Sequence, residues 1–337
     1  MTDLIRSGSL THFPEVARSV GLDPKKMMQQ ARLPLACLER PDVRIAVSGF
    51  RRLLEMSAAA SGAQDFGLRM AERGGLANLG PVALVVREQP TIGDAIDALA
   101  RYIHIHHDGM RLDIRRGGKT VMIALTLRGR SPSALNQSTD LGLATIHRVI
   151  QSLTGEDWRP VEVHFRYPPP ANRDRHAEFF RCPLVFNSEV DAVLISAHDL
   201  ERRVGHAHPL MANYLRKRVE EINARPESWD GKVDEVVRSL LASGDCTVER
   251  VAEHFACTRR TLHRRLAECG TSFSAIVDAQ RADLVVRLVE EPERPLAGIA
   301  EQLGFSAQSA MARWFRARFG CTITAWRRGE RPVAKLA

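Results

Sequence analysis

Features that would mark an exported, membrane-bound or zinc-stabilised protein are scarce in this chain of 337 residues. No window approaches eighteen consecutive apolar residues, and the first twenty residues contain no apolar run of signal-peptide length. The cysteines lie far apart, and none forms a Cys-x-x-Cys pair or a paired Cys/His spacing. They are Cys37, Cys182, Cys246, Cys257, Cys269 and Cys321. We expect a soluble, cytoplasmic protein with reduced thiols, no structural zinc and no membrane partner.

Motifs of common enzyme classes are also missing. The chain has no Gly-rich phosphate-binding loop, no Gly-x-Ser-x-Gly elbow and no His-Glu-x-x-His zinc motif. Histidines gather at His104, His106 and His107, where a helical i, i+3 pair could hold a metal, but no second ligand group has suitable spacing. We therefore expect no catalytic residue, no metal and no cofactor, and we predict that the protein is not an enzyme.

The residues that are present describe a globular protein with an excess of positive charge. Hydrophobic residues make up 44% of the chain, which is ordinary for a protein with a packed core. A length of 337 residues favours two domains over one. The net charge of +8 suggests an anionic partner but does not decide the question, because many basic proteins bind no nucleic acid.

The first two hundred residues combine helical and strand patterns. Apolar residues recur at three- and four-residue spacing over 50–60, 91–107 and 138–155, which predicts helices. Apolar and polar residues alternate over 111–116 and 120–128 with Gly-Gly-Lys between them, which predicts a β-hairpin. Residues 161–167, 184–186 and 192–196 are further strand candidates. An α+β domain with an antiparallel sheet is therefore expected.

The rest of the chain is predicted to be helical. A charged helix over 208–224 precedes the polar segment "RPESWDGK", which is the best linker candidate. No strand signal follows Val233. From residue 229 onward the chain has 17 basic and 14 acidic residues, so this part is not generally basic. A nucleic-acid-binding surface there would have to come from the placement of the charges.

A weak internal repeat lies in this helical part. The stretch "VERVAEHFACTRRTLHRRL", from Val248, matches "LAGIAEQLGFSAQSAMARWF", from Leu296, with an offset of 48 before the turn and 49 after it. Each copy is an amphipathic helix, a short turn and a second amphipathic helix, with Thr258 and Ser306 as the expected N-caps. This is the pattern of a helix-turn-helix unit.

Helical-wheel positions separate the charged residues of the first copy from its core. At about 100° per residue, Leu262 and Leu266 face inward. Arg260, His263 and Arg264 lie together on the opposite side, within roughly 100° of arc. These three residues therefore point toward solvent or toward a partner.

The second copy repeats this arrangement with fewer charges. Met311 and Phe315 face inward, while Ser309, Arg313 and Arg316 point outward. The offset of 49 places Ser309 and Arg313 at two outward positions that arginines occupy in the first copy. A single Arg-rich helix is often only a solvated face, but two capped copies with matching outward positions weaken that interpretation.

The outward residue types suit DNA. An arginine can donate two hydrogen bonds to O6 and N7 of guanine, and histidine, serine and glutamine also reach base edges. Flanking arginines, here Arg259 and Arg265, are expected to contact phosphates, which fix position without reading sequence.

The segment from Thr247 to Arg328 resembles the DNA-binding domain of the AraC/XylS family of transcription regulators. The resemblance is carried by both repeat copies, the "GFS" turn, Arg313 and the "FG" that follows the second copy. It implies two helix-turn-helix units joined by a long helix, here about residues 273–290, whose recognition helices enter successive major-groove faces of one site. Ala256 departs from the glycine usual in the first turn. The implied base-reading residues are Arg260, His263 and Arg264 for one segment, and Gln308, Ser309 and Arg313 for the other, with Arg316 at a phosphate.

The first two hundred residues resemble the "arabinose-binding"-type N-terminal domain found in some of these regulators. The carriers include "GLDPKKMMQQARLPLACLERPDVRIAVSGFRRLLE" and "FFRCPLVFNSEVDAVLISAHDLERR". The resemblance implies an α+β sensor and dimerisation domain and no particular ligand. Because ligand pockets combine aromatic walls with a few polar groups, five residues are candidates for an effector pocket. They are Tyr102, His106, Trp158, His164 and Phe186.

We therefore predict a transcription regulator, an activator by resemblance, with double-stranded DNA, a small-molecule effector, RNA polymerase and a second copy of itself as partners. Residues 1–205 would bind the effector and dimerise, 206–231 would connect, and 232–331 would bind DNA. Two alternatives remain. The N-terminal domain could only dimerise or dock another protein, or it could be an enzyme fused to a DNA-binding tail.

Overall fold

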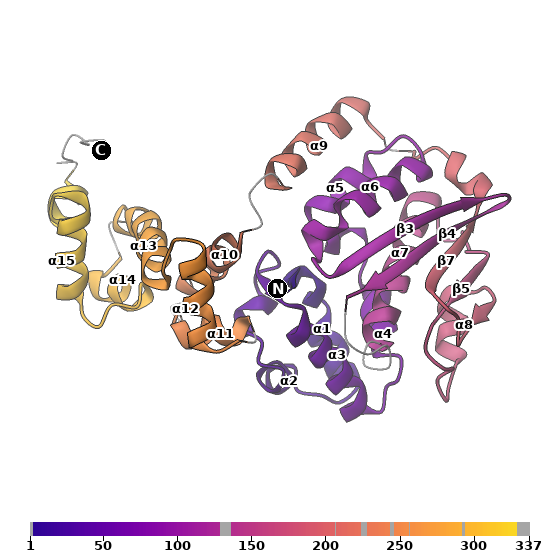
Figure 1. Cartoon of the computed structure of the whole chain (residues 1–337), viewed down its shortest axis with the longest axis horizontal. Helices are drawn as coiled ribbons and strands as arrows, with labels where there is room; N and C mark the ends of the chain where they lie inside the picture. Colours follow the sequence, from indigo (N-terminus) through magenta and orange to yellow (C-terminus); the bar gives the residue numbers. More distant parts are fainter. Residues whose placement is uncertain are drawn as a thin grey trace. The chain divides into compact units, whose positions relative to one another are not determined.

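A computed structural model describes residues 3–128, 136–205, 207–223, 228–242, 246–255, 257–291 and 294–328. The chain divides into two compact units, Met1–Arg225 and Pro226–Ala337 (Figure 1). In the described part of the chain, no helix is both long enough and apolar enough to cross a lipid bilayer.

The first unit contains a two-stranded and a five-stranded sheet among its described residues. The antiparallel pair joins β1 (Leu4–Arg6) to β2 (Arg44–Ala46). The larger sheet has the order β3-β4-β7-β5-β6. Its strands are β3 (Met110–Gly117), β4 (Thr120–Leu127), β5 (Glu162–His164), β6 (Leu184–Val185) and β7 (Asp191–Ser196). The alternation in the sequence therefore predicted all five strands of this sheet.

Two features of these sheets differ from the expectation. β5 and β6 run parallel, whereas the other neighbouring strands of the large sheet are antiparallel. The pair β1–β2 was not predicted, because each strand has three residues and its partner lies about forty residues away in the chain. Strands this short offer too few residues for a period-2 pattern to be visible.

Helices of the first unit cover this sheet and form a separate helical layer (Figure 1). Helix α7 packs on β4 and β7, α6 packs on β3, and α3 and α4 pack on α7. Helix α9 packs on α5 and so belongs to the first unit. The α-helices are α1 (Phe13–Ser19), α2 (Pro24–Gln30), α3 (Val47–Ser61), α4 (Phe66–Arg73), α5 (Pro81–Arg87), α6 (Ile92–His106), α7 (Asn136–Thr154), α8 (Asp174–Phe180) and α9 (Pro209–Asn223). Short 3-10 helices span Ser7–Leu10, Leu35–Leu38, Leu76–Leu79 and Ala197–Glu201.

The buried apolar residues of this unit form two clusters. One lies between the sheet and helices α5, α6 and α7, and includes Leu99, Ile103 and Phe165. The other fills the helical layer formed by α1 to α4, and includes Phe13 and Phe50. Gly67 on α4 permits a very close approach to α7, because a Cβ there would overlap the carbonyl oxygen of Gln137.

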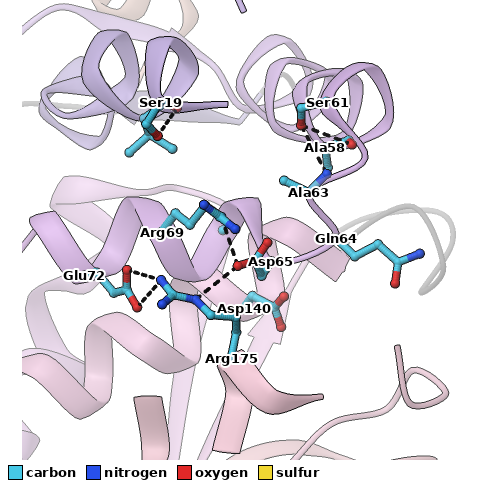
Figure 2. Close-up of polar contacts among 12 residues, drawn as sticks. Ser19, Ala58, Ser61, Ala63, Gln64, Asp65, Arg69, Glu72, Asp140 and Arg175 are labelled. Atoms are coloured by element: carbon cyan, nitrogen blue, oxygen red, sulfur yellow. Dashed lines mark hydrogen bonds and ion pairs between the residues drawn. The ribbon is translucent and has the colours of Figure 1, made fainter. Parts of the chain in front are cut away.

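A network of ion pairs connects α8 to α4. Figure 2 shows Arg175 between two carboxylates of the α4 region. Its Nη2 lies 2.6 Å from Glu72 and its Nε lies 3.3 Å from Asp65. Asp65 also pairs with Arg69 at 2.9 Å. Because these opposite charges pair with one another within the fold, we interpret the cluster as structural.

The described residues of the second unit are helical without strands, as predicted. The helices are α10 (Trp229–Ala242), α11 (Val248–His254), α12 (Arg259–Glu268), α13 (Phe273–Val289), α14 (Leu296–Gln302), α15 (Gln308–Phe319) and α16 (Ile323–Arg327). Helix α13 packs against α10 and also contacts α14. It matches the long joining helix that the sequence resemblance implied, and it links the pair α11–α12 to the pair α14–α15.

Candidate nucleic-acid interface and ligand cavity

The first helix-turn-helix unit is formed by α11 and α12. The hydroxyl of Thr258 accepts a hydrogen bond from the backbone N–H of Thr261 at 3.2 Å, which confirms Thr258 as the N-cap of α12. Leu262 and Leu266 are fully buried, as the helical wheel predicted. Ala256, the departure from glycine in the turn, lies outside the described residues.

The second helix-turn-helix is formed by α14 and α15, and its recognition helix, α15, begins one residue later than predicted. Ala307, not Ser306, is the N-cap of α15, and no side chain caps it. The expected N-cap was therefore wrong, because the second turn is one residue longer than the first. The same extra residue changes the repeat offset from 48 to 49. Met311 and Phe315 are fully buried, so the predicted inward face is confirmed.

The residues predicted to read bases lie on the exposed sides of both recognition helices. Their exposed side chains are Arg260, His263 and Arg264 on α12, and Gln308, Ser309 and Arg313 on α15. On α12 these residues lie on the side opposite the buried leucines. On α15 they lie on the side opposite the buried methionine and phenylalanine. Both helices therefore present an exposed polar surface, on which Arg264 lies 3.9 Å from Glu268.

The flanking arginines differ in their surroundings. Arg259 forms an ion pair with Glu249 at 2.8 Å, while about 62% of its side chain stays exposed. The guanidinium of Arg265 lies over the ring of Trp229, 4.7 Å from its centroid. Arg316 is exposed on α15. Arg265 is thus held against α10, and only part of its surface faces solvent.

Arg281, which no sequence pattern singled out, holds the second turn in place. It reaches from α13 and donates hydrogen bonds to the backbone carbonyls of Leu303 at 2.8 Å and Gly304 at 3.0 Å. Its guanidinium also lies 4.4 Å from the ring centroid of Phe305. Gly304 has a φ of +70°, a left-handed conformation that favours glycine. Periodicity could not identify Arg281, because its partners are backbone groups about twenty residues away.

The five candidate pocket residues of the first unit do not share one cavity. Four of them form hydrogen bonds or ring-stacking contacts with other residues of the protein. The Tyr102 hydroxyl donates to Glu220 at 3.0 Å, and the Trp158 indole N–H donates to Asp199 at 3.1 Å.

The other two of these four lie beside the parallel strand pair. His164 is within 3.1 Å of Ser188 and 3.0 Å of Glu162, and Phe186 stacks on Phe165 at 4.8 Å. Of the five candidates, His106 borders a mainly apolar cavity, and Tyr102 lines a different, more polar one.

The apolar cavity has a volume of about 70 Å³ and lies where the two hydrophobic clusters meet. His106 and His107, at the end of α6, form part of its wall. Burial, followed by the charges of His107, Arg6 and Arg44, lowers the pKa of His106 well below its usual value, and burial, followed mainly by the charge of Arg51, lowers the pKa of His107 to about 3. Both imidazoles are therefore neutral at physiological pH.

Comparisons with known proteins agree with this two-part architecture. Residues 21–204 match the model of the arabinose-binding domain of AraC transcription regulators, an N-terminal domain, and residues 251–329 match a helix-turn-helix domain. The chain belongs to the AraC family of transcription regulators. It is a sequence-specific DNA-binding regulator with an N-terminal domain of the ligand-binding type.

Relatives of this AraC-family regulator extend over almost its full length. It is 28% identical to the HTH-type transcriptional regulator VirS of Mycobacterium tuberculosis, over 96% of each chain. It is 26% identical to the ornithine utilization regulator of Pseudomonas aeruginosa, over 90% of each chain. The crystal structure of the transcriptional regulator CdpR from Pseudomonas aeruginosa aligns at 19% identity with a TM-score of 0.44, covering 90% of this chain and 96% of that one.

Proposed function

We propose that this AraC-family regulator reads one DNA site with both recognition helices, α12 and α15. The observation that supports it is the repeated geometry: each helix buries one face and exposes polar side chains at equivalent positions. The proposed base-reading residues are Arg260, His263 and Arg264 on α12, and Gln308, Ser309 and Arg313 on α15. The two DNA segments they read would be about one helical turn apart.

Selection of bound duplexes from a random pool tests this proposal. We expect an enriched site with two short conserved segments separated by about ten base pairs. A single conserved segment would contradict the use of both helices, and an unenriched pool would contradict sequence-specific reading by these residues. The selected duplex then serves as the specific site in titrations of variants.

The arginines beside the base-reading positions are proposed to contact phosphates: Arg259, Arg265 and Arg316. We expect Arg265→Ala to weaken binding to specific and random duplexes by a similar factor, because phosphate contacts carry no sequence information. The logarithm of the binding constant decreases with the logarithm of the salt concentration, and the steepness of this decrease (the salt slope) should become smaller by roughly one unit. Titrations at several salt concentrations measure both effects.

The stacking of Arg265 on Trp229 requires a control for folding. Trp229→Phe keeps an aromatic ring under the guanidinium and should leave the salt slope unchanged. An Arg265→Ala protein that lost affinity for one sequence only would contradict the phosphate assignment.

For the rest of the chain we propose a cytoplasmic homodimer that activates transcription together with RNA polymerase, in response to a small molecule. Residues 1–205 would bind the effector and dimerise, 206–231 would connect, and 232–331 would bind DNA. Family membership supports these roles, and the apolar cavity of the first unit supports effector binding. An effector acts only if it binds two states of the protein with different affinity.

A thermal-shift screen of metabolites, followed by transcription in vitro with RNA polymerase, tests the effector role. We expect at least one compound to raise the melting temperature and to change transcript yield from the selected site. If no compound does so while DNA binding is intact, the N-terminal unit serves only to dimerise or to dock another protein. Chemical turnover of a stabilising compound would show an enzymatic activity and contradict our view that the protein is not an enzyme.

A further inference from the structure

We propose that the cavity beside His106 and Ser138 binds an uncharged, mainly apolar small molecule that carries at least one hydrogen-bonding group. This inference rests on the proposed effector role of the first unit and specifies the chemistry of the ligand. Four observations carry it: the apolar wall, two unpaired buried polar atoms, the pairing of the one permanently charged wall residue, and the residues that can move.

The wall of the cavity is apolar and comes from both hydrophobic clusters. Phe50 and Met70 belong to the cluster of the helical layer, and Leu99 and Ile103 belong to the cluster beneath the sheet. A molecule in this cavity would contact both clusters at once. Its binding would be stabilised in proportion to the apolar surface that it removes from water.

Two polar side-chain atoms on this wall are buried without a hydrogen-bond partner. They are Nδ1 of His106 and Oγ of Ser138, and their residues are 6% and 7% exposed. A buried polar group without a partner is destabilising, and a ligand hydroxyl or carbonyl would satisfy it. The other ring nitrogen of His106, Nε2, lies 2.9 Å from Oγ of Ser9. Because either atom of that pair can donate, Nδ1 can serve as acceptor or donor to a ligand.

Arg6, Arg44 and Arg51 lie close to His106 or His107 but do not line the cavity, and Arg6 and Arg51 each keep buried N–H groups without a hydrogen-bond partner. Arg6 pairs with Asp42, and Arg44 pairs with Asp108. Arg148 is the one permanently charged residue among the described wall residues, and its guanidinium donates to Gln151 at 2.9 Å and lies 3.7 Å from Glu156.

A carboxylate placed deep in the cavity would therefore lose its hydration without gaining an unpaired cation on the wall. Burying a charge in this way costs far more than burying a hydroxyl. This difference favours a neutral ligand over an anionic one.

The size of the cavity implies that the wall moves when the ligand enters. An engineered apolar cavity of about 150 Å³ accepts benzene, and the cavity here has about half that volume. Met70 and Met110 lie on the wall, and unbranched methionine side chains adapt readily to a new shape. A ligand with a six-membered ring would enter by displacing one or both of them.

Calorimetric titration of the full chain with benzyl alcohol and benzoate tests the ligand class. These probes share a ring and differ in charge. We expect benzyl alcohol to bind at least tenfold more tightly than benzoate. Ser138→Ala should weaken benzyl alcohol binding about threefold to tenfold, because one hydrogen bond is lost. The matched control is Ser152→Ala on the same helix, α7, where the side chain is exposed; this variant should bind like the parent protein.

A cavity-filling variant locates the binding site. Ala71 lines the cavity and is 3% exposed, so Ala71→Leu should abolish benzyl alcohol binding. If this variant fails to fold, NMR of the cavity residues during xenon binding to the parent protein shows whether this cavity accepts an apolar guest. Equal or tighter binding of benzoate, or benzyl alcohol binding that Ala71→Leu and Ser138→Ala leave unchanged, overturns the proposal.

Failure of this inference is distinguishable from failure of the effector role. If a metabolite from the screen stabilises the protein equally well in Ala71→Leu, the effector binds elsewhere and the cavity proposal is wrong. If benzyl alcohol binds as predicted but no compound changes transcription from the selected site, the cavity proposal stands and the effector role is wrong.

Discussion

Replacing Arg313 with alanine should weaken binding to the selected duplex about 5- to 150-fold, which corresponds to about 1–3 kcal/mol. Arg313 is exposed on α15, on the side opposite the fully buried Met311 and Phe315. A bidentate arginine–guanine contact discriminates between bases, so its loss should relax the preference at one base position while other positions keep theirs. Equilibrium titration and repeated selection from random duplexes measure the two effects.

Arg318 provides the matched control for this variant. It is an exposed arginine on the same helix, five residues further on, and therefore points about 140° away from Arg313. Arg318→Ala removes the same charge and should leave the base preference unaltered. If Arg313→Ala selects the same sequences as the parent protein, the assignment of the outward face of α15 is wrong.

Phe315→Ala should lower the free energy of unfolding of the second unit by about 3–5 kcal/mol, the usual cost of deleting a buried phenylalanine ring. Phe315 is fully buried among residues of α13, α14 and α16. Its ring centroid lies 4.6 Å from that of Phe319 and 5.6 Å from that of Trp326. Because the ring joins α15 to α16 and to the helices beneath, its removal should also loosen the recognition helix and weaken DNA binding.

Urea unfolding followed by tryptophan fluorescence measures this change. Trp314 and Trp326 belong to the same cluster and report on it, while Trp158 reports on the first unit. The control is the exposed neighbour Arg316, whose replacement by alanine should change the stability by less than about 0.5 kcal/mol. Equal shifts for Phe315→Ala and Arg316→Ala would contradict the placement of Phe315 in the core.

Local periodicity was enough to predict much of both units. The hairpin β3–β4 was expected because alternating residues flank a Gly-containing turn, and the structure pairs Met110 with Leu127 through Gly117 with Thr120. The inward faces of α12 and α15 followed from helical spacing, and all four predicted inward residues are fully buried. These features depend on residues within one or two turns of each other, so a short window of sequence contains the information.

Contacts between distant residues could not be predicted in this way. The position of the N-cap at Ala307 depends on a turn one residue longer than its copy, and the turn itself is held by Arg281 through backbone carbonyls. The pairing of β1 with β2 and the parallel pairing of β5 with β6 are likewise long-range choices. Backbone acceptors are the same in every residue, so no residue type in the sequence identifies them as partners.

The candidate pocket shows this division most clearly. Residue type alone suggested aromatic and histidine residues of the first unit as pocket candidates. The internal repeat in the sequence was sufficient to identify both helix-turn-helix copies. Only the packing of the chain separated His106, with its unpaired nitrogen at a cavity, from Tyr102 and Trp158, whose polar atoms are bonded to Glu220 and Asp199. The physical reason is that periodicity decides which face of an element is buried, whereas the neighbours it meets there come from distant parts of the chain.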